Sequence, residues 1–339
     1  MPDVDPNAAA CGEGMFGLDT SPQEAGVILV PVPFDATTSY RPGAARGPEA
    51  ILQASYQIDL HDREVGDPWR AGIALLDPLP EIVGHGTTAR RLVEELRERP
   101  DEDKLARVNQ LCGEVNERVA AEVSHWLRSG RLVGTIGGDH ATAYGSIKAH
   151  AGHFGEFGIL HIDAHADLRR EYEGFTWSHA SVMEAVCRHL PAVSRLVQVG
   201  VRDFCEEEAG RIADASGRIV TFFDADMNER LFTGATWAAI VAEIVEALPQ
   251  RVYISFDIDG LDPNLCPNTG TPVPGGLSFP RACYLLRAVA RSGRQIIGFD
   301  LVEVAPGPAG GDEWDGNVGA RLLYKLIGVA LQSRRDTPH

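Results

Sequence analysis

Two acidic pairs and two histidines, each following an apolar segment, are the residues of this sequence most able to do chemistry. Asp163, His165 and Asp167 follow the apolar run 157–162 at alternate positions. Because side chains alternate in direction along a strand, we expect these three groups to point to one side where the strand ends. Two carboxylates and an imidazole favour a divalent ion such as manganese, iron, nickel or zinc over calcium. An N-cap with two solvated acids is the simpler alternative for this segment alone.

Two further segments repeat the pattern. The run 251–256 has the composition of a core strand and continues into Asp257 and Asp259, while 132–136 leads through two glycines to His140. Each segment alone is weak evidence for a metal site, because Asp-x-Asp pairs also occur in glycosyltransferases and a lone histidine is more often a core residue. Together the three segments supply four aspartates and two histidines, which suits two adjacent metal ions that share bridging carboxylates.

These motifs, in this order, resemble the metal-binding motifs of the ureohydrolases, the family that comprises arginase, agmatinase and related amidinohydrolases. The similar segments are Gly-Gly-Asp-His at 137–140, Asp-Ala-His-Ala-Asp at 163–167, Ser-Phe-Asp-Ile-Asp-Gly-Leu-Asp-Pro at 255–263, and the segments 38–43 and 298–303. The resemblance extends from about residue 26 to about residue 326. It implies hydrolysis of a guanidinium group to urea and an amine, and a homo-oligomer, either a trimer or a hexamer.

The order of apolar and amphipathic segments predicts an α/β fold, with three α-β-α layers around a central, mostly parallel, arginase-like sheet. Strands are predicted at 26–34, 132–136, 157–162, 195–201, 219–223, 252–256 and 295–301, and helices from 49 onward and at 88–99, 105–128, 180–189, 236–248, 280–292 and 318–331. Because the ligand motifs span the middle of the chain and must meet, we predict one catalytic domain, 26–335. An arm, 1–25, precedes it, either loose or against a neighbouring subunit. The Pro/Gly-rich segment 262–280 is predicted to be an ordered loop beside the second acidic pair, as a lid or pocket wall.

The composition and net charge of the chain restrict its possible binding partners. The 339 residues are 44% hydrophobic, enough for a sizeable core, and carry a formal net charge of -17. This charge disfavours nucleic acid or an anionic membrane as partner and fits a small cationic substrate. A start without the basic and apolar regions of a signal peptide, and apolar runs shorter than the ~20 residues of a membrane span, predict a cytoplasmic protein. The sequence contains no Cys-x-x-Cys pair, so neither a disulfide framework nor a zinc ribbon is indicated. The six cysteines are Cys11, Cys112, Cys187, Cys205, Cys266 and Cys283.

The resemblance assigns roles to particular residues. Two divalent ions, Mn²⁺ or alternatively Ni²⁺, are expected to lower the pKa of a bridging water. Their ligands are predicted to be His140, Asp163, His165, Asp167, Asp257 and Asp259. Asp167 is also expected to help protonate the departing amine, Glu303 to pair with the substrate guanidinium, and His179 to shuttle protons. The simpler alternatives are a surface ion pair for Glu303, and a capping or core histidine for His179, since Ser178 looks like an N-cap.

Two departures from arginase bear on the substrate. Arginases carry Ser-x-Asn before the mobile histidine to hold an α-carboxylate, whereas residues 175–178 read Phe-Thr-Trp-Ser, and Cys205 replaces a second acid after Asp203. Both count against arginine, and the runs 167–174 and 178–183 look agmatinase-like, so agmatine, giving putrescine, is the predicted substrate. Arginine, guanidinobutyrate and free guanidine remain alternatives, and whether Trp177 and Cys205 line the pocket is open. From other classes, a one-zinc deacetylase-like enzyme and a non-catalytic partner subunit are the alternatives.

Overall fold

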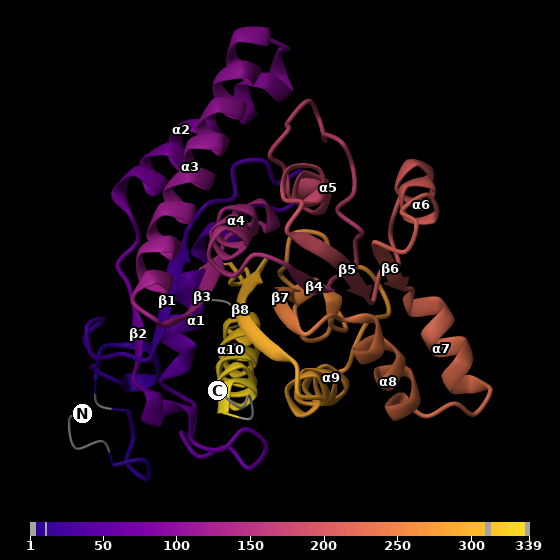
Figure 1. Ribbon diagram of the computed structural model, residues 1–339. Helices are drawn as coiled ribbons and strands as arrows, with labels where there is room; N and C mark the ends of the chain where they lie inside the picture. The colour runs from indigo at the N-terminus through magenta and orange to yellow at the C-terminus, as the bar shows by residue number, and fades with distance from the viewer. Residues whose placement is uncertain (1–4, 11, 309–312, 336–339) are drawn as a thin grey trace.

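A parallel sheet runs through the middle of the molecule with helices on both faces (Figure 1). The computed structural model describes residues 5–10, 12–308 and 313–335. Eight strands, all paired in parallel, lie in the order β2-β1-β3-β8-β7-β4-β5-β6. They are β1 Val27–Val32, β2 Ile73–Leu75, β3 Leu132–Gly137, β4 Phe157–Ile162, β5 Val193–Val199, β6 Ile219–Phe222, β7 Arg251–Asp257 and β8 Gln295–Val302. The predicted three-layer α/β fold is therefore confirmed.

Two sets of helices cover the sheet and enclose separate parts of the core. Buried residues of α1, α8, α9 and α10 join one large apolar cluster, and those of α2, α3, α4 and α5 join clusters on the other face. The helices are α1 Gly47–Ser55, α2 Pro80–Glu98, α3 Glu102–Arg128, α4 Ala143–Phe154, α5 Val182–His189, α6 Glu206–Ala213, α7 Asp224–Phe232, α8 Trp237–Ala247, α9 Phe279–Arg291 and α10 Trp314–Arg335. In the part of the chain that the structure describes, no helix is long and apolar enough to cross a membrane.

Helices α2 and α3 form a long hairpin that projects beyond the sheet (Figure 1). Helix α3 begins at an N-cap, Asp101, whose carboxylate accepts the Lys104 backbone N–H at 3.0 Å, and a left-handed Gly130 follows its end. Helix α2 begins eight residues earlier than the predicted 88. Two glycines in its first turns hid the helical pattern, and Pro80 at its first position starts it.

The predicted arm, 1–25, contributes to the core of its own chain. Met15, Phe16 and Leu18 are buried in the cluster beneath α1 and α10, and the Phe16 ring lies edge-on to Tyr324 with 4.8 Å between centroids. The prediction that the arm is either loose or laid against a neighbouring subunit is therefore wrong for these three residues. The division at residue 25 stays a prediction. Cys11 lies outside the described residues, and the five described cysteines are free thiols.

Candidate metal centre and substrate cavity

The candidate ligands lie at the carboxyl ends of three strands of the sheet. His140 follows β3, Asp163 follows β4, and Asp257 is the last residue of β7. The carboxyl ends of parallel strands meet at one edge, where α/β proteins place their sites. Strands β4 and β7 are paired directly, and β8 lies between β7 and β3. The sheet thus brings the three sequence motifs together.

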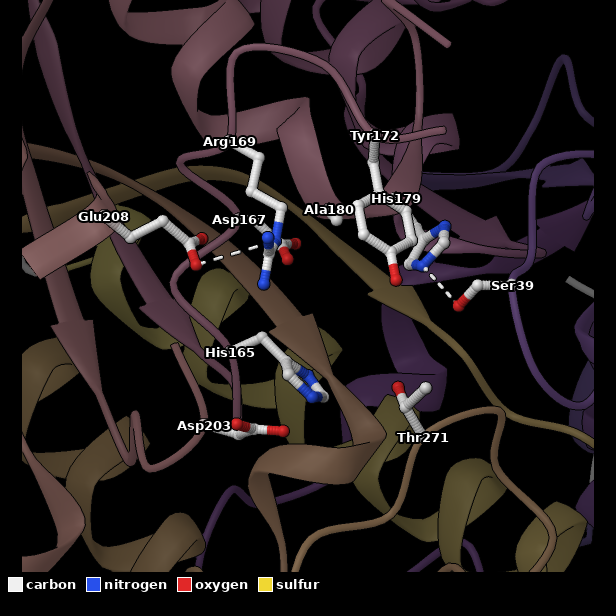
Figure 2. A pocket seen from close by; sticks show the side chains of 10 residues that line it. All are labelled: Ser39, His165, Asp167, Arg169, Tyr172, His179, Ala180, Asp203, Glu208 and Thr271. Atoms are coloured by element: carbon white, nitrogen blue, oxygen red, sulfur yellow. Dashed lines mark hydrogen bonds and ion pairs between the residues drawn. The ribbon is translucent and has the colours of Figure 1, made fainter. Parts of the chain in front are cut away.

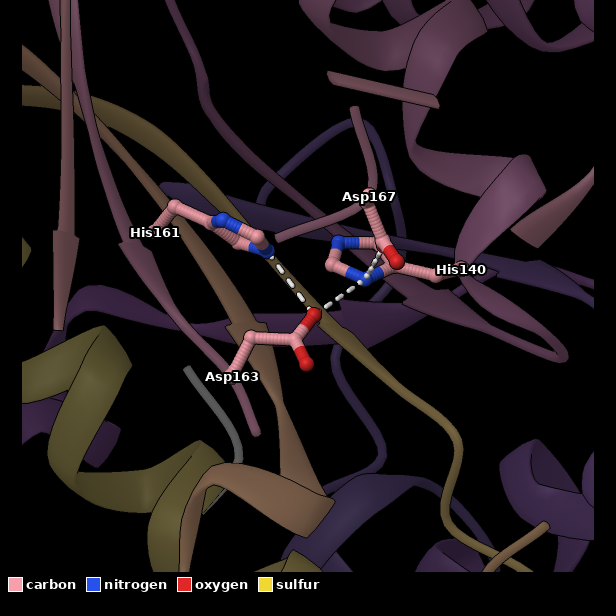
Figure 3. A group of neighbouring side chains, drawn as sticks. All are labelled: His140, His161, Asp163 and Asp167. Carbon is pink, nitrogen blue, oxygen red and sulfur yellow. Dashed lines mark hydrogen bonds and ion pairs between the residues drawn. The ribbon is translucent and has the colours of Figure 1, made fainter. Parts of the chain in front are cut away.

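His140 faces three carboxylates at once, and two of them, those of Asp163 and Asp167, are drawn in Figure 3. Its Nδ1 lies 3.0 Å from Asp163 Oδ2, 3.0 Å from Asp167 Oδ2 and 3.3 Å from Asp257 Oδ2, yet this buried nitrogen has no hydrogen-bond partner. The other nitrogen, Nε2, lies 2.9 Å from Ser255 Oγ, whose hydroxyl donates to Asp300 at 2.9 Å. Ser255 therefore accepts from Nε2–H, and Nδ1 keeps a lone pair directed at carboxylate oxygens. A cation between them fits this donor set.

A second group of ligand atoms adjoins the first. His165 Nδ1 lies 3.4 Å from Asp163 Oδ1 and 3.2 Å from Asp259 Oδ2. Backbone donors fix the acids, since Ala164 N–H donates to Asp259 at 3.0 Å and Asp259 N–H donates to Asp257 at 2.8 Å. Asp163 offers one oxygen to each group, the arrangement expected of a carboxylate that bridges two ions. All six predicted metal ligands therefore lie together.

Electrostatics at this edge of the sheet favours a bound cation. Burial, with the nearby Asp163 carboxylate, raises the pKa of Asp167 to about 6. Burial, with Asp259 and Asp163, holds the pKa of Asp257 well above its usual range. The pKa of Asp163 lies well below its usual range, because contacts with His161, His140 and His165 outweigh the effect of burial. Crowded buried carboxylates repel one another, and divalent ions relieve that repulsion.

A cavity of about 140 Å³ opens beside the ligands (Figure 2). It is lined by Ser39, His165, Asp167, Arg169, Tyr172, His179, Ala180, Asp203, Glu208 and Thr271. Thr271 comes from the loop between Gly260 and α9, so this loop forms a wall of the cavity, as predicted for 262–280. The Arg202 guanidinium holds the loop in place by donating to the carbonyl oxygens of Val273 and Leu261.

A tight turn carries Tyr172 and His179 to the cavity. Tyr172 pairs with Phe175 across Glu173 and Gly174, which have φ of 53° and 81°. Glu173 is strained there, whereas Gly174 is not. Ser178 caps the short helix His179–Ser181, as the sequence indicated, and His179 nevertheless reaches the cavity, with Nε2 3.4 Å from Ser39 Oγ. Burial, with His165 and His140, lowers the pKa of His179 to about 4, so its imidazole is neutral at pH 7.

Glu303 follows β8 as a buried carboxylate, so the alternative of a surface ion pair is wrong. Its backbone has φ of 62°, and its Oε1 accepts the His140 backbone N–H at 3.0 Å. Burial, with Asp139 and Asp259, holds the pKa of Glu303 well above its usual range, so this buried carboxylate needs a cationic partner to remain charged. A residue in a strained conformation beside a candidate ligand is consistent with a functional role.

Sequence reasoning missed several residues here. His161 lies in one group with His140, Asp163 and Asp167 (Figure 3), and its signal was its position two residues before Asp163, on the same face of β4. Arg169, Tyr172 and Thr271 line the cavity from loops that carry no comparable pattern. Of the two open cases, Trp177 is partly buried and packs against the core, with its ring centroid 4.7 Å from that of Tyr144. Cys205 caps α6, its backbone N–H donating to Glu208 at 2.9 Å.

An α/β sheet that presents clustered aspartates and histidines beside a small cavity is typical of metal-dependent hydrolases. A model of the Arginase family matches residues 25–328, and the chain belongs to this family. It is a hydrolase of amidino carbon–nitrogen bonds. The family depends on a binuclear metal centre, and the clustered His and Asp side chains could bind one. Neither alternative from another class, the deacetylase-like enzyme or the non-catalytic subunit, is supported.

Relatives with named activities cover most of the chain. It is 37% identical to N(1)-aminopropylagmatine ureohydrolase of Thermus thermophilus over 317 residues, 93% of this chain and 94% of the relative. It is 31% identical to agmatinase of Cronobacter sakazakii over 285 residues, 82% of this chain and 79% of the relative. The crystal structure of agmatine ureohydrolase of Thermoplasma volcanium superposes with a TM-score of 0.74 and 23% identity, covering 96% of each chain, which shows the shared fold.

Proposed function

We propose that this enzyme hydrolyses a guanidino compound without an α-carboxylate, with agmatine, which yields putrescine, as the simplest substrate. Among the acidic side chains of the cavity lining, Asp203 supports this substrate class most directly, because Asp167 is a candidate metal ligand and Glu208 already pairs with Arg169. The Arg169 guanidinium is already engaged, 3.7 Å from Glu208 and 5.1 Å from the centre of the Tyr172 ring. The exposed Asp203 adds further negative charge, which suits an ammonium tail and repels a carboxylate tail.

The guanidinium end of the substrate is assigned to the ligand side of the cavity. Two divalent ions bound by the six ligands would supply a water of lowered pKa as the nucleophile and polarise the carbon under attack. Glu303 pairs with the guanidinium and orients it, since a carboxylate and a guanidinium form a planar, charge-assisted pair. Asp167 accepts a proton from the attacking water and passes it to the departing amine. His179, neutral at pH 7, exchanges protons between the site and bulk water.

A second candidate substrate is N(1)-aminopropylagmatine. The relatives named for this activity match at 37% identity over 93% of the chain, against 31% over 82% for the agmatinase quoted above. The additional ammonium group of this substrate would meet the exposed carboxylate of Asp203, which lines the cavity. Mn²⁺ as the metal, with Ni²⁺ as the alternative, and a homo-oligomeric state, trimer or hexamer, belong to the same proposal.

A substrate panel tests the proposal. We expect urea release, measured after loading with Mn²⁺ or Ni²⁺ separately, to give a higher kcat/KM with agmatine or aminopropylagmatine than with arginine, guanidinobutyrate or guanidine. Asp203→Asn should lower the ratio of kcat/KM for agmatine to kcat/KM for guanidinobutyrate. Asp226→Asn, which neutralises an exposed acid of α7, should leave this ratio unchanged. The highest kcat/KM with arginine would overturn the argument about the substrate tail.

A further inference from the structure

A row of buried polar residues crosses the sheet just before the ligands. The residues occupy one register on five adjacent strands, where His161 of β4 is paired with Gln198 of β5 and Ser255 of β7. Gln198 is paired in turn with Thr221 of β6, and Ser255 with Asp300 of β8. His161, Gln198, Ser255 and Asp300 are fully buried. Such residues are costly inside a sheet unless each polar group has a partner.

Hydrogen bonds along the row fix the orientation of the Gln198 amide. Gln198 Nε2 lies 2.7 Å from the carbonyl oxygen of Ala166, and Oε1 lies 3.0 Å from the Thr221 hydroxyl, which donates to it. A carbonyl oxygen only accepts, so the atom facing Ala166 must be the amide nitrogen. The same nitrogen lies 3.0 Å from His161 Nδ1 and directs its second hydrogen there.

The amide orientation determines where His161 carries its proton. Because Nδ1 accepts a hydrogen from Gln198, the neutral imidazole has its N–H at Nε2. His161 Nε2 lies 2.8 Å from Asp163 Oδ2 and donates to it (Figure 3). The other oxygen of Asp163 accepts the His165 backbone N–H at 2.6 Å. Both oxygens of the candidate bridging carboxylate are thus held by donors of the chain.

Relying on the metal centre in the proposed function, we propose that His161 is a positioning residue and not a metal ligand. Its imidazole donates a hydrogen bond to Asp163, and Gln198 sets the tautomer of that imidazole. His140 and His161 lie in one cluster, with ring centroids 5.1 Å apart, and the row gives them different tasks. Ser255 leaves the His140 lone pair facing the carboxylates, whereas Gln198 leaves the His161 N–H facing one of them. Partners that orient ligands in this way commonly change metal affinity by 10–100-fold.

Two substitutions of His161 separate a donor from a ligand. Glutamine can place an N–H where Nε2 lies, whereas leucine cannot donate. We expect metal-free His161→Gln to bind two Mn²⁺ per chain with a dissociation constant within about threefold of the unsubstituted protein, and His161→Leu to bind two with about 10–100-fold weaker affinity. Titration followed by electron paramagnetic resonance of free Mn²⁺ measures both stoichiometry and affinity. If His161→Gln weakens binding as much as His161→Leu, or lowers the stoichiometry to one, His161 is a ligand and the proposal fails.

A third variant leaves His161 and all six candidate ligands in place. Gln198→Leu removes the hydrogen that selects the tautomer, so the imidazole is free to lose its donor to Asp163, and we expect Mn²⁺ affinity to fall by about tenfold. His150→Leu is the matched control, because it replaces another fully buried histidine, which bonds to the Ser146 carbonyl oxygen. It should leave Mn²⁺ affinity unchanged, whatever it does to the unfolding temperature.

The readouts separate this inference from the function on which it rests. Unchanged Mn²⁺ affinity in His161→Leu, with only a lower unfolding temperature of the metal-free protein, would show a purely structural role and overturn the inference. Failure of the unsubstituted protein to bind Mn²⁺ or Ni²⁺ or to release urea would instead refute the proposed function. Two bound ions, active enzyme and equal losses in both His161 variants would refute the inference alone.

Discussion

Replacing Glu303 by glutamine tests the proposed recognition of the guanidinium with little disturbance of the fold. The Glu303 Oε1 atom accepts the His140 backbone N–H at 3.0 Å, and a glutamine carbonyl oxygen can accept the same bond. The backbone stays as it is, with Glu303 N–H donating to Gly138 O at 2.8 Å. The substitution therefore removes the negative charge and retains the bond that holds the neighbouring candidate ligand.

The expected loss follows from a buried charged pair. Glu303 is only 5% exposed, so a guanidinium paired with it is shielded from water and loses much of its partner when the charge is removed. Removing one member of a buried, hydrogen-bonded charge pair costs about 2–5 kcal/mol. If that cost falls on the transition state, kcat/KM for agmatine should fall by about 30- to 5,000-fold.

Urea release with agmatine, measured beside Mn²⁺ titration, is the assay. We expect Glu303→Gln to bind Mn²⁺ with nearly unchanged affinity and to lose turnover. Glu184→Gln is the matched control, because Glu184 is a largely buried acid that pairs with Arg188 and Arg211 on α5 and α6. It should alter stability and leave kcat/KM within about threefold. A Glu303→Gln enzyme with kcat/KM within threefold of the unsubstituted enzyme would refute the assigned role.

Three other predictions concern metal, pH and the proposed proton shuttle. Mn²⁺ at 100 times its dissociation constant should stabilise the metal-free protein by about 3 kcal/mol, visible as a higher unfolding temperature, and no shift would argue against binding at the native site. Burial lowers the pKa of His150 from 6.5 to about 4, so the unfolded chain binds more protons and stability should fall as pH drops from about 6.5 towards 4. In denaturant titrations at pH 7 and pH 4, the stability lost between the two pH values should be smaller in His150→Gln than in the unsubstituted protein, by up to about 3 kcal/mol. An equal loss in both proteins would show that His150 is not its source. His179→Asn should lower kcat by about 10²–10⁴-fold, with partial rescue by added imidazole, and an unchanged kcat would exclude a shuttle.

The sequence predicted most of the fold because strands buried on both faces are mostly apolar runs. Seven of the eight strands were found in this way, whereas β2, only three residues long at the sheet edge, has no detectable pattern. Helix α4 was missed because its sequence, Ala-Tyr-Gly-Ser-Ile-Lys-Ala-His-Ala-Gly-His-Phe, contains two glycines and lacks a clear apolar stripe. Helices α6 and α7 were missed because their acidic turns read as loop.

The sequence indicated which side chains lie together where their positions follow from strand ends, but not where their positions depend on tertiary packing. His140, Asp163 and Asp257 end or follow strands whose carboxyl ends meet, so spacing alone indicated convergence. The hydrogen bond between His161 and Gln198 depends on the register of β4 against β5, which single-strand patterns do not contain. Cavity walls formed by loops depend on how distant segments pack, and no local spacing records that.

Metal content and urea release, measured on the same preparation of the enzyme, test the central claim most directly. The account predicts two divalent ions per chain and hydrolysis of agmatine or aminopropylagmatine in the unsubstituted enzyme. In a variant carrying both Asp163→Ala and Asp257→Ala, which removes two acids from beside His140, both should be lost. Full turnover by the doubly substituted enzyme would contradict the account.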